Sequence, residues 1–286
     1  MNARNLSVMK LEDAFAYAIE LRPVVDALRL LRSKLSTEYC YHSEGHTLDV
    51  INESLRFGKA DKLPENDLKL IVIAAAWHDT GFVIGRDEHE LQGVKLFTEY
   101  CKESRKHDLK PSDIETISQL IKDTKLLNTE DGVKQIPSSS LSRYLLDADL
   151  SNLGRKDFFC CLDRLCEENQ VQCYDFYRQT LDFIARHTWH TQAANRIRRQ
   201  QQIRNIAELT RRIFNERYSF SCAVHAREAS INGQVTFLEY DNVRDRCALN
   251  CPAKIGGCLA RVMSPWQTLQ LFHNKSLHTP PVVDSE

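Results

Sequence analysis

The spacing of apolar residues along the first three quarters of the chain is the strongest constraint on its fold. Between residues 10 and 35, apolar side chains recur every three or four positions, as in Leu11, Phe15, Ala18 and Ile19. This spacing is typical of a helix with one buried face, whereas strict alternation is typical of a half-buried strand. We find no such alternation before residue 216. We therefore expect an all-α domain over residues 1–216.

The same periodicity predicts a series of helices separated by glycine and proline. Pro23 predicts a kink or a break inside the first of them, because proline lacks the amide hydrogen that a helix interior needs. The expected helices cover residues 10–35, 46–57, 66–78, 90–106, 112–124, 139–150, 156–169, 172–188 and 193–216.

Length and charge narrow the class of protein. A chain of 286 residues with 42% hydrophobic residues can bury a sizeable core without disulfides. Its 38 Lys+Arg and 39 Asp+Glu give a net charge of −1, which argues against a dedicated polyanion binder. No segment approaches the ~20 apolar residues of a membrane-spanning helix, and the N-terminus lacks the apolar core of a signal peptide. We therefore expect a cytoplasmic protein without a membrane partner.

The character of the sequence changes after Tyr218. Short runs rich in Val, Phe and Tyr, such as residues 234–240, indicate a small β-rich appendix over residues 217–275 and a disordered tail over 276–286. Two interpretations of its cysteines stay open, namely reduced thiols and ligands of zinc or an iron–sulfur cluster. The four cysteines that could hold this second metal are Cys222, Cys247, Cys251 and Cys258.

Three short segments carry the residue types of a metal site. In the first, His42, His46 and Asp49 are three and four positions apart, so a helix would place them on one face. Two imidazoles and a carboxylate suit a divalent ion or proton transfer. Surface histidines with the same spacing are the alternative.

The second segment is an apolar run that ends in His78-Asp79, followed shortly by Gly81, which lets the chain turn. Neighbouring side chains on a helix point about 100° apart. His78 and Asp79 can therefore reach the same ion only if it lies across the helix from both residues. The alternative makes His78 a buried histidine with satisfied hydrogen bonds and Asp79 a surface charge.

The third segment places Asp147 and Asp149 among apolar residues. A carboxylate is costly to bury unless it is paired or bound to a metal. A helix-capping role is the alternative for either aspartate.

In the order His, His-Asp, Asp, the chain resembles the HD-domain superfamily of metal-dependent phosphohydrolases, whose core is a helical bundle. The resemblance covers about residues 38–210. It implies that His46, His78, Asp79 and Asp149 bind a divalent metal ion, with Mn, Fe, Zn, Co and Mg all compatible with mixed nitrogen and oxygen ligands.

The cyclic-nucleotide phosphodiesterase branch supplies the finer assignments. Residues 148–152, Ala-Asp-Leu-Ser-Asn, are similar to a stretch of that branch in which the aspartate is a ligand, and this favours Asp149. In the same branch the histidine that corresponds to His42 is the general acid. That branch also carries a further histidine shortly after its His-Asp, which residues 80–83 lack. We therefore do not expect cyclic-nucleotide phosphodiesterase activity.

The implied function is hydrolysis of a phosphate ester, either a nucleotide or another small phosphorylated metabolite, as a monoester or a diester. The resemblance implies attack of a metal-bound hydroxide on phosphorus, with Asp79 and His42 as catalytic residues and His42 protonating the leaving oxygen. A catalytically silent nucleotide-binding or signalling module of the same fold is the alternative. A di-iron oxygenase would need more histidine ligands, for which His89 and His107 are the nearby candidates.

Four further residues are candidates for substrate binding. Asp49 lies beside the first histidines. His89-Glu90 resembles a pair from other branches that suits a second metal or a substrate phosphate, and a solvated pair is the alternative. Arg186 and His190 precede an arginine-rich segment, 196–212, and arginine forks suit phosphate. A solvated helix face is the alternative for these arginines. Contact with nucleic acid is a third hypothesis, which the neighbouring acidic residues weaken.

Overall fold

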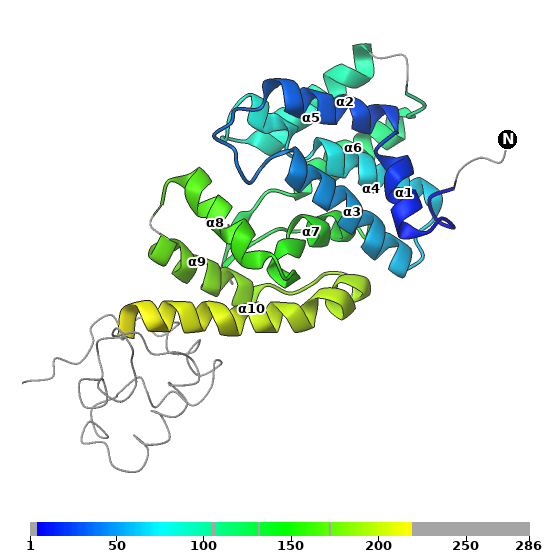
Figure 1. Ribbon diagram of the computed structural model, residues 1–286. Helices are drawn as coiled ribbons and strands as arrows, with labels where there is room; N and C mark the ends of the chain where they lie inside the picture. Colours follow the sequence, from blue (N-terminus) through cyan, green and yellow to red (C-terminus); the bar gives the residue numbers. More distant parts are fainter. Residues whose placement is uncertain (1–4, 104–106, 131, 172, 219–286) are drawn as a thin grey trace, which may run out of the picture. The chain divides into compact units, whose positions relative to one another are not determined.

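The computed structural model describes residues 5–103, 107–130, 132–171 and 173–218 (Figure 1). This part of the chain is mostly helical, as the periodicity predicts. Its elements are α1 (Leu11–Ala18), α2 (Arg22–Lys34), α3 (Glu44–Ala60), α4 (Glu65–Trp77), η1 (Thr80–Val83), α5 (His89–Glu103), α6 (Pro111–Asp123), β1 (Leu127–Thr129), β2 (Gly132–Lys134), α7 (Ser142–Asp149), η2 (Ser151–Gly154), α8 (Phe158–Asn169), α9 (Cys173–Arg186) and α10 (Gln192–Tyr218).

The helical segments expected from the sequence correspond to these helices in order. The first expected segment is broken rather than kinked, because α1 ends at Ala18 and Pro23 occupies the first turn of α2. A first turn accepts proline without loss, since its amide hydrogens have no partner within the helix. Pro23 therefore starts a helix here instead of bending one.

The hairpin of β1 and β2 was not expected. Its strands pair antiparallel, with Leu127 opposite Lys134 and Thr129 opposite Gly132. The prediction that residues before 216 contain no strand is therefore wrong at this point. Strands of three residues are too short to show an alternating pattern, and most of their residues are exposed.

Helix α4 lies at the centre of the helical core. Its residues from Leu68 to Trp77 are buried apart from Lys69, and it packs against α3, α6, α2 and α7. A helix surrounded by neighbours is apolar on all sides, which is why this segment lacks a polar face. Trp77 closes the helix by donating from Nε1 to the carbonyl oxygen of Pro23 over 3.0 Å.

The chain divides into two compact units. The first comprises Met1–Gln170 and His187–Gln202, and the second comprises Val171–Arg186 and Ile203–Glu286. His46, His78, Asp79 and Asp149 all belong to the first unit. The expected appendix and tail lie outside the described residues beyond Tyr218, and so do Cys222, Cys247, Cys251 and Cys258.

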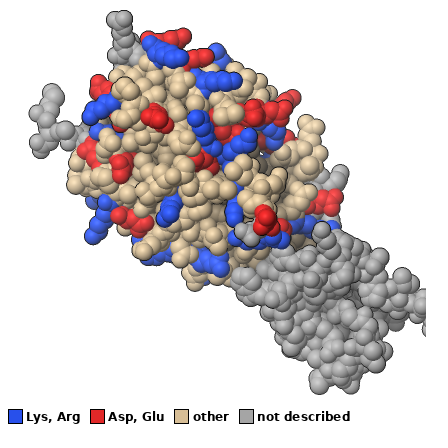
Figure 2. All heavy atoms as spheres, turned by 180° about the vertical axis from the view of Figure 1, so that it is seen from behind, with Lys and Arg blue, Asp and Glu red and all other residues tan. Residues whose placement is uncertain are grey.

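Surface charge of both signs is distributed over the described part of the chain. Figure 2 shows basic and acidic side chains interspersed on one face. Within the described residues, no helix is long and apolar enough to cross a bilayer. Five cysteines of the described part are free thiols, namely Cys40, Cys101, Cys160, Cys161 and Cys166.

Candidate metal centre

Three of the expected ligands form a buried group that could hold a metal ion. His46 lies in the first turn of α3, and His78 and Asp79 follow directly after α4. One ligand atom from each of these residues lies within 4.8 Å of the other two. The helices α3 and α4 pack side by side, so the two histidines meet although they are far apart in the sequence.

Asp149, the last residue of α7, extends this group. Its Oδ1 lies 3.2 Å from His46 Nε2 and 3.5 Å from His78 Nε2. Asp79 Oδ2 lies 3.5 Å from His46 Nε2 and 3.1 Å from His78 Nε2. Each histidine nitrogen therefore faces one oxygen of each aspartate. We call these four residues the metal centre.

The orientation of His78 suits a ligand. Its Nδ1 lies 2.7 Å from the carbonyl oxygen of Ala75, which only accepts hydrogen bonds, so Nδ1 carries the hydrogen. In the neutral ring Nε2 then presents a lone pair towards the aspartates. His78 is only 1% exposed, and both its Nε2 and Asp79 Oδ2 are buried without a hydrogen-bond partner. A buried pair of acceptors facing each other is what a cation between them would satisfy.

The spacing of the donor atoms also fits a metal ion. Ligands at about 2.1 Å from one ion, at right or tetrahedral angles, lie about 3.0–3.4 Å from each other. The four separations between histidine nitrogens and aspartate oxygens run from 3.1 to 3.5 Å. Two imidazoles and two carboxylates form a mixed nitrogen and oxygen set that suits several divalent transition metals.

Electrostatics point to the same need for positive charge. Burial lowers the pKa of His78, but the carboxylates of Asp79 and Asp149 outweigh it and raise that pKa well above 6.5. Burial raises the pKa of both aspartates, but the neighbouring histidines His78 and His46 outweigh it and lower both values. Two ionised carboxylates at this depth need protonated imidazoles or a cation beside them.

His42 lies beside the metal centre and is held by Glu168 of α8. Its Nδ1 is 2.5 Å from Glu168 Oε1, while Glu168 Oε2 accepts the backbone N–H groups of Tyr41 and His42 at 2.9 and 3.0 Å. Burial lowers the pKa of His42, but the bond to Glu168 and nearby carboxylates outweigh it, so this pKa is raised. Because Glu168 engages Nδ1, Nε2 is the nitrogen left for a substrate.

Phe82 stacks with both histidines that flank the metal centre. Its ring centroid lies 4.5 Å from that of His42 and 4.1 Å from that of His89. His89 Nε2 lies 3.7 Å from Asp79 Oδ1 and 3.5 Å from Glu90 Oε1. His89 is thus close to the oxygen of Asp79 that faces away from the other histidines.

A glycine allows this close approach of η1 and α5. A Cβ atom at Gly81 would lie 1.8 Å from the carbonyl oxygen of His89 and 2.8 Å from the nitrogen of Gly93. Both contacts are with backbone, which cannot move aside as a flexible side chain can. Only glycine therefore lets the start of α5 bring His89 next to Asp79.

The remaining expected substrate residues lie in other surroundings. Asp49 has a side chain that is 51% exposed, and its Oδ2 pairs with Arg155 at 2.8 Å. His190 donates its backbone N–H to Asp147. Arg186 pairs with Asp182 at 3.0 Å and belongs to the second unit. The structure therefore brings together His42, His46, His78, Asp79, His89 and Asp149, and gives Asp49, His190 and Arg186 other partners.

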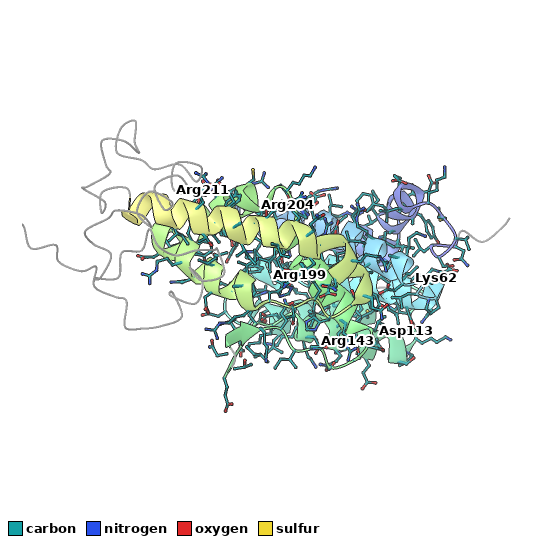
Figure 3. All side chains as sticks on the ribbon, turned by 90° about the horizontal axis from the view of Figure 1, so that it is seen from below. Lys62, Asp113, Arg143, Arg199, Arg204 and Arg211 are labelled. Carbon is teal, nitrogen blue, oxygen red and sulfur yellow. The ribbon has the colours of Figure 1, made fainter. Side chains whose placement is uncertain are left out.

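The arginines of α10 are partly neutralised. Arg199, Arg204 and Arg211 project from this helix (Figure 3). Arg211 and Arg212 both pair with Glu208, at 2.7 and 3.0 Å. Acidic partners on the same helix weaken the hypothesis of a nucleic-acid-binding face.

His107 is the other histidine considered as an additional ligand. Its Nε2 lies 2.9 Å from the backbone oxygen of Cys101. This bond engages the nitrogen that would otherwise be available to an ion. Within the described residues, the group that could hold a metal consists of His46, His78 and Asp79.

Sequence patterns missed two side chains that hold the site. Glu168 and Gln135 come from α8 and from the residue after β2, far along the chain from the residues they contact. A buried acidic residue near the end of α8 and a glutamine in a polar loop carry no spacing signal. Only tertiary packing identifies them.

Comparison of this chain with protein-family models, with curated proteins and with solved structures found no match in any of the three.

Proposed function

We propose that this protein is a metal-dependent phosphohydrolase of the HD-domain type, acting on the phosphate ester of a nucleotide or another small metabolite. The observation that supports it is the metal centre, in which two histidines and two aspartates from α3, from α7 and from the residues directly after α4 face one another at 3.1–3.5 Å. The order of these residues along the chain is the one on which the resemblance to that superfamily rests.

His46, His78, Asp79 and Asp149 would hold a divalent ion. When bound, such an ion lowers the pKa of a coordinated water towards ~7 and polarises a phosphoryl oxygen. Two of these residues are anchored through the atom that faces away from the other ligands: His78 Nδ1 bonds to the carbonyl oxygen of Ala75, and Asp149 Oδ2 accepts from Gln135. Anchored ligands keep their orientation when a substrate enters.

His42 is the proton donor in this proposal. Glu168 fixes the ring and favours the proton on it, so that Nε2 can protonate the leaving oxygen of the ester. General acid catalysis of this kind contributes about 10²–10⁴-fold to a rate. The stacking of the His42 ring on Phe82 keeps the plane of the ring fixed while the proton is transferred.

His89 would bind the phosphate of the substrate. It reaches the metal centre on the side of Asp79 Oδ1, and its ring stacks on Phe82 at an interplanar angle of 25°. An imidazole N–H at this position donates a hydrogen bond to a phosphoryl oxygen without competing for the nitrogens of His46 and His78.

Elemental analysis of purified protein tests the proposal directly. Wild type, His46→Ala and a matched control, His107→Ala, are compared after loading with Mn²⁺ and gel filtration. We expect at least one divalent ion per chain in wild type and in His107→Ala, and a large loss in His46→Ala. The loaded wild type is then screened against phosphate monoesters and diesters.

Two outcomes would contradict the proposal. Absence of bound metal from reloaded wild type would remove the centre on which it rests. Metal in wild type together with tight nucleotide binding, but no turnover of any phosphate ester, would favour the catalytically silent binding module instead.

A further inference from the structure

Gln135, directly after β2, connects the hairpin to the metal centre. It is only 3% exposed. Its Nε2 donates to Asp149 Oδ2 and to the carbonyl oxygen of Thr124, both over 2.7 Å. Thr124 precedes β1, so Gln135 closes the hairpin at its base and touches a metal-centre residue with the same amide group.

The orientation of this amide is determined by its neighbours. Asp149 Oδ2 and the oxygen of Thr124 are both acceptors, so a flipped amide would place Oε1 against two oxygens. In the observed orientation Oε1 is buried without a hydrogen-bond partner. The side chain thus leaves its own oxygen unsatisfied while it donates to Asp149, which indicates that the bond to Asp149 fixes its position.

The two oxygens of Asp149 have separate partners as a result. Oδ2 is bound by Gln135, and Oδ1 faces His46 and His78 at 3.2 and 3.5 Å. A carboxylate with one oxygen engaged by a fixed donor cannot rotate freely about its last bond. Gln135 therefore fixes the orientation in which the carboxylate of Asp149 faces the histidines.

We propose that Gln135 is a positioning residue of the metal centre, which couples the folding of the β1–β2 hairpin to the affinity for the metal ion. This inference rests on the proposed function, since it assumes that Asp149 is a ligand. If the docked hairpin strengthens metal binding, then bound metal must stabilise the docked hairpin by the same factor, because linkage is reciprocal.

A second glutamine supplies a matched control. Gln119 of α6 donates from Nε2 to Asp123 Oδ1 over 2.8 Å, and Asp123 Oδ2 in turn accepts the backbone and hydroxyl hydrogens of Ser138 after the hairpin. Replacing Gln119 therefore removes a glutamine–aspartate bond at the same hairpin base without touching Asp149.

The first experiment measures the dissociation constant of Mn²⁺ by titration calorimetry for wild type, Gln135→Met and Gln119→Met as full-length chains. Methionine has the length of glutamine but no donor. We expect Gln135→Met to raise the Kd by about 10–100-fold, as loss of a ligand's supporting hydrogen bond does, and Gln119→Met to change it less than about threefold. Equal Kd values for wild type and Gln135→Met would overturn the role of Gln135 and leave the metal centre intact.

A measurement on wild type alone covers the case in which Gln135→Met does not fold. Hydrogen exchange is followed over residues 127–138 with and without saturating Mn²⁺. We expect amide exchange there to slow by at least about tenfold when metal is bound. Unchanged exchange in metal-loaded protein would overturn the coupling, whereas failure of wild type to bind Mn²⁺ at all would overturn the proposed function with it.

Discussion

Asp147 and Asp149 lie two positions apart on α7 and meet opposite surroundings. Asp147 is fully buried, and its oxygens accept the backbone N–H groups of His190 and Thr191 and the hydroxyl of Thr191, at 2.7–2.9 Å. Asp149 Oδ1 instead faces the nitrogens of His46 and His78. One side of α7 supports the start of α10, and the other side supports the metal centre.

Burial of a carboxylate does not by itself reveal its chemistry. Burial raises the pKa of Asp147 to about 6, although its three hydrogen bonds lower it, whereas the histidines lower the pKa of Asp149. Asp147 has donors with fixed hydrogens around it and little capacity left for a cation. Asp149 faces ring nitrogens that can themselves be ligands.

Activity should separate the two aspartates most strongly. We expect Asp149→Ala to reduce phosphate-ester hydrolysis by at least about 10³-fold, since metal-ion catalysis supplies several kcal/mol and each 1.36 kcal/mol is tenfold in rate. Asp147→Ala should keep kcat within about threefold at a temperature where it is folded. Steady-state kinetics of both variants in Mn²⁺ test this, and similar losses would erase the distinction.

For the free energy of unfolding, we expect the larger loss in Asp147→Ala and the smaller one in Asp149→Ala. Asp147→Ala removes the acceptor of three hydrogen bonds, and we expect it to lower the free energy of unfolding by about 2–4 kcal/mol. Asp149→Ala, measured in a chelator, should cost less, because the side chain of Asp149 is 15% exposed whereas Asp147 is fully buried, and because His46 and His78 keep Asp79 beside them. Urea unfolding followed by circular dichroism gives both values. A larger loss for Asp149→Ala would show that Asp149 is the structural residue.

His187, which precedes α10, should make the stability of the protein sensitive to acid. Burial, with His190 and Arg199 nearby, lowers the pKa of His187 from 6.5 to about 3. Between these values the unfolded chain takes up a proton that the folded chain does not, so stability is lost as the pH falls below 6.5.

Replacing His187 with phenylalanine should remove this loss and keep a ring against Trp189, whose centroid is 4.6 Å away. From pH 7 to pH 5 we expect wild type to lose about 1–2 kcal/mol more than His187→Phe. Urea unfolding at the two pH values measures the difference. Parallel pH dependence of both proteins would assign the acid sensitivity to other groups.

The fold was largely predictable because helices leave a local signal. Spacing of apolar residues located the helices and the break near Pro23, and the continuous apolar run of α4 matches its central position. The hairpin was missed because its strands are three residues long. The β-rich appendix and the disordered tail expected beyond Tyr218 stay predictions.

The site was predictable only in part. The histidines and aspartates of the metal centre could be named because they stand in a recognisable order, but the choice between Asp147 and Asp149 needed a resemblance. Which donors surround a carboxylate is decided by packing of distant elements. Glu168 and Gln135 could not be found for the same reason. The substrate role of Asp49 stays a prediction, and in the structure its Oδ2 pairs with Arg155.

The close packing around Gly81 limits which variants of this protein would survive selection for activity. It contributes no side-chain atom, yet any Cβ there meets the backbone of α5 at 1.8 Å. In a library selected for activity, this position will tolerate as little change as the ligands do. Intolerance to substitution in such a library would then have two different causes. The ligands would be intolerant because they take part in the chemistry, and Gly81 would be intolerant because there is no room for a side chain.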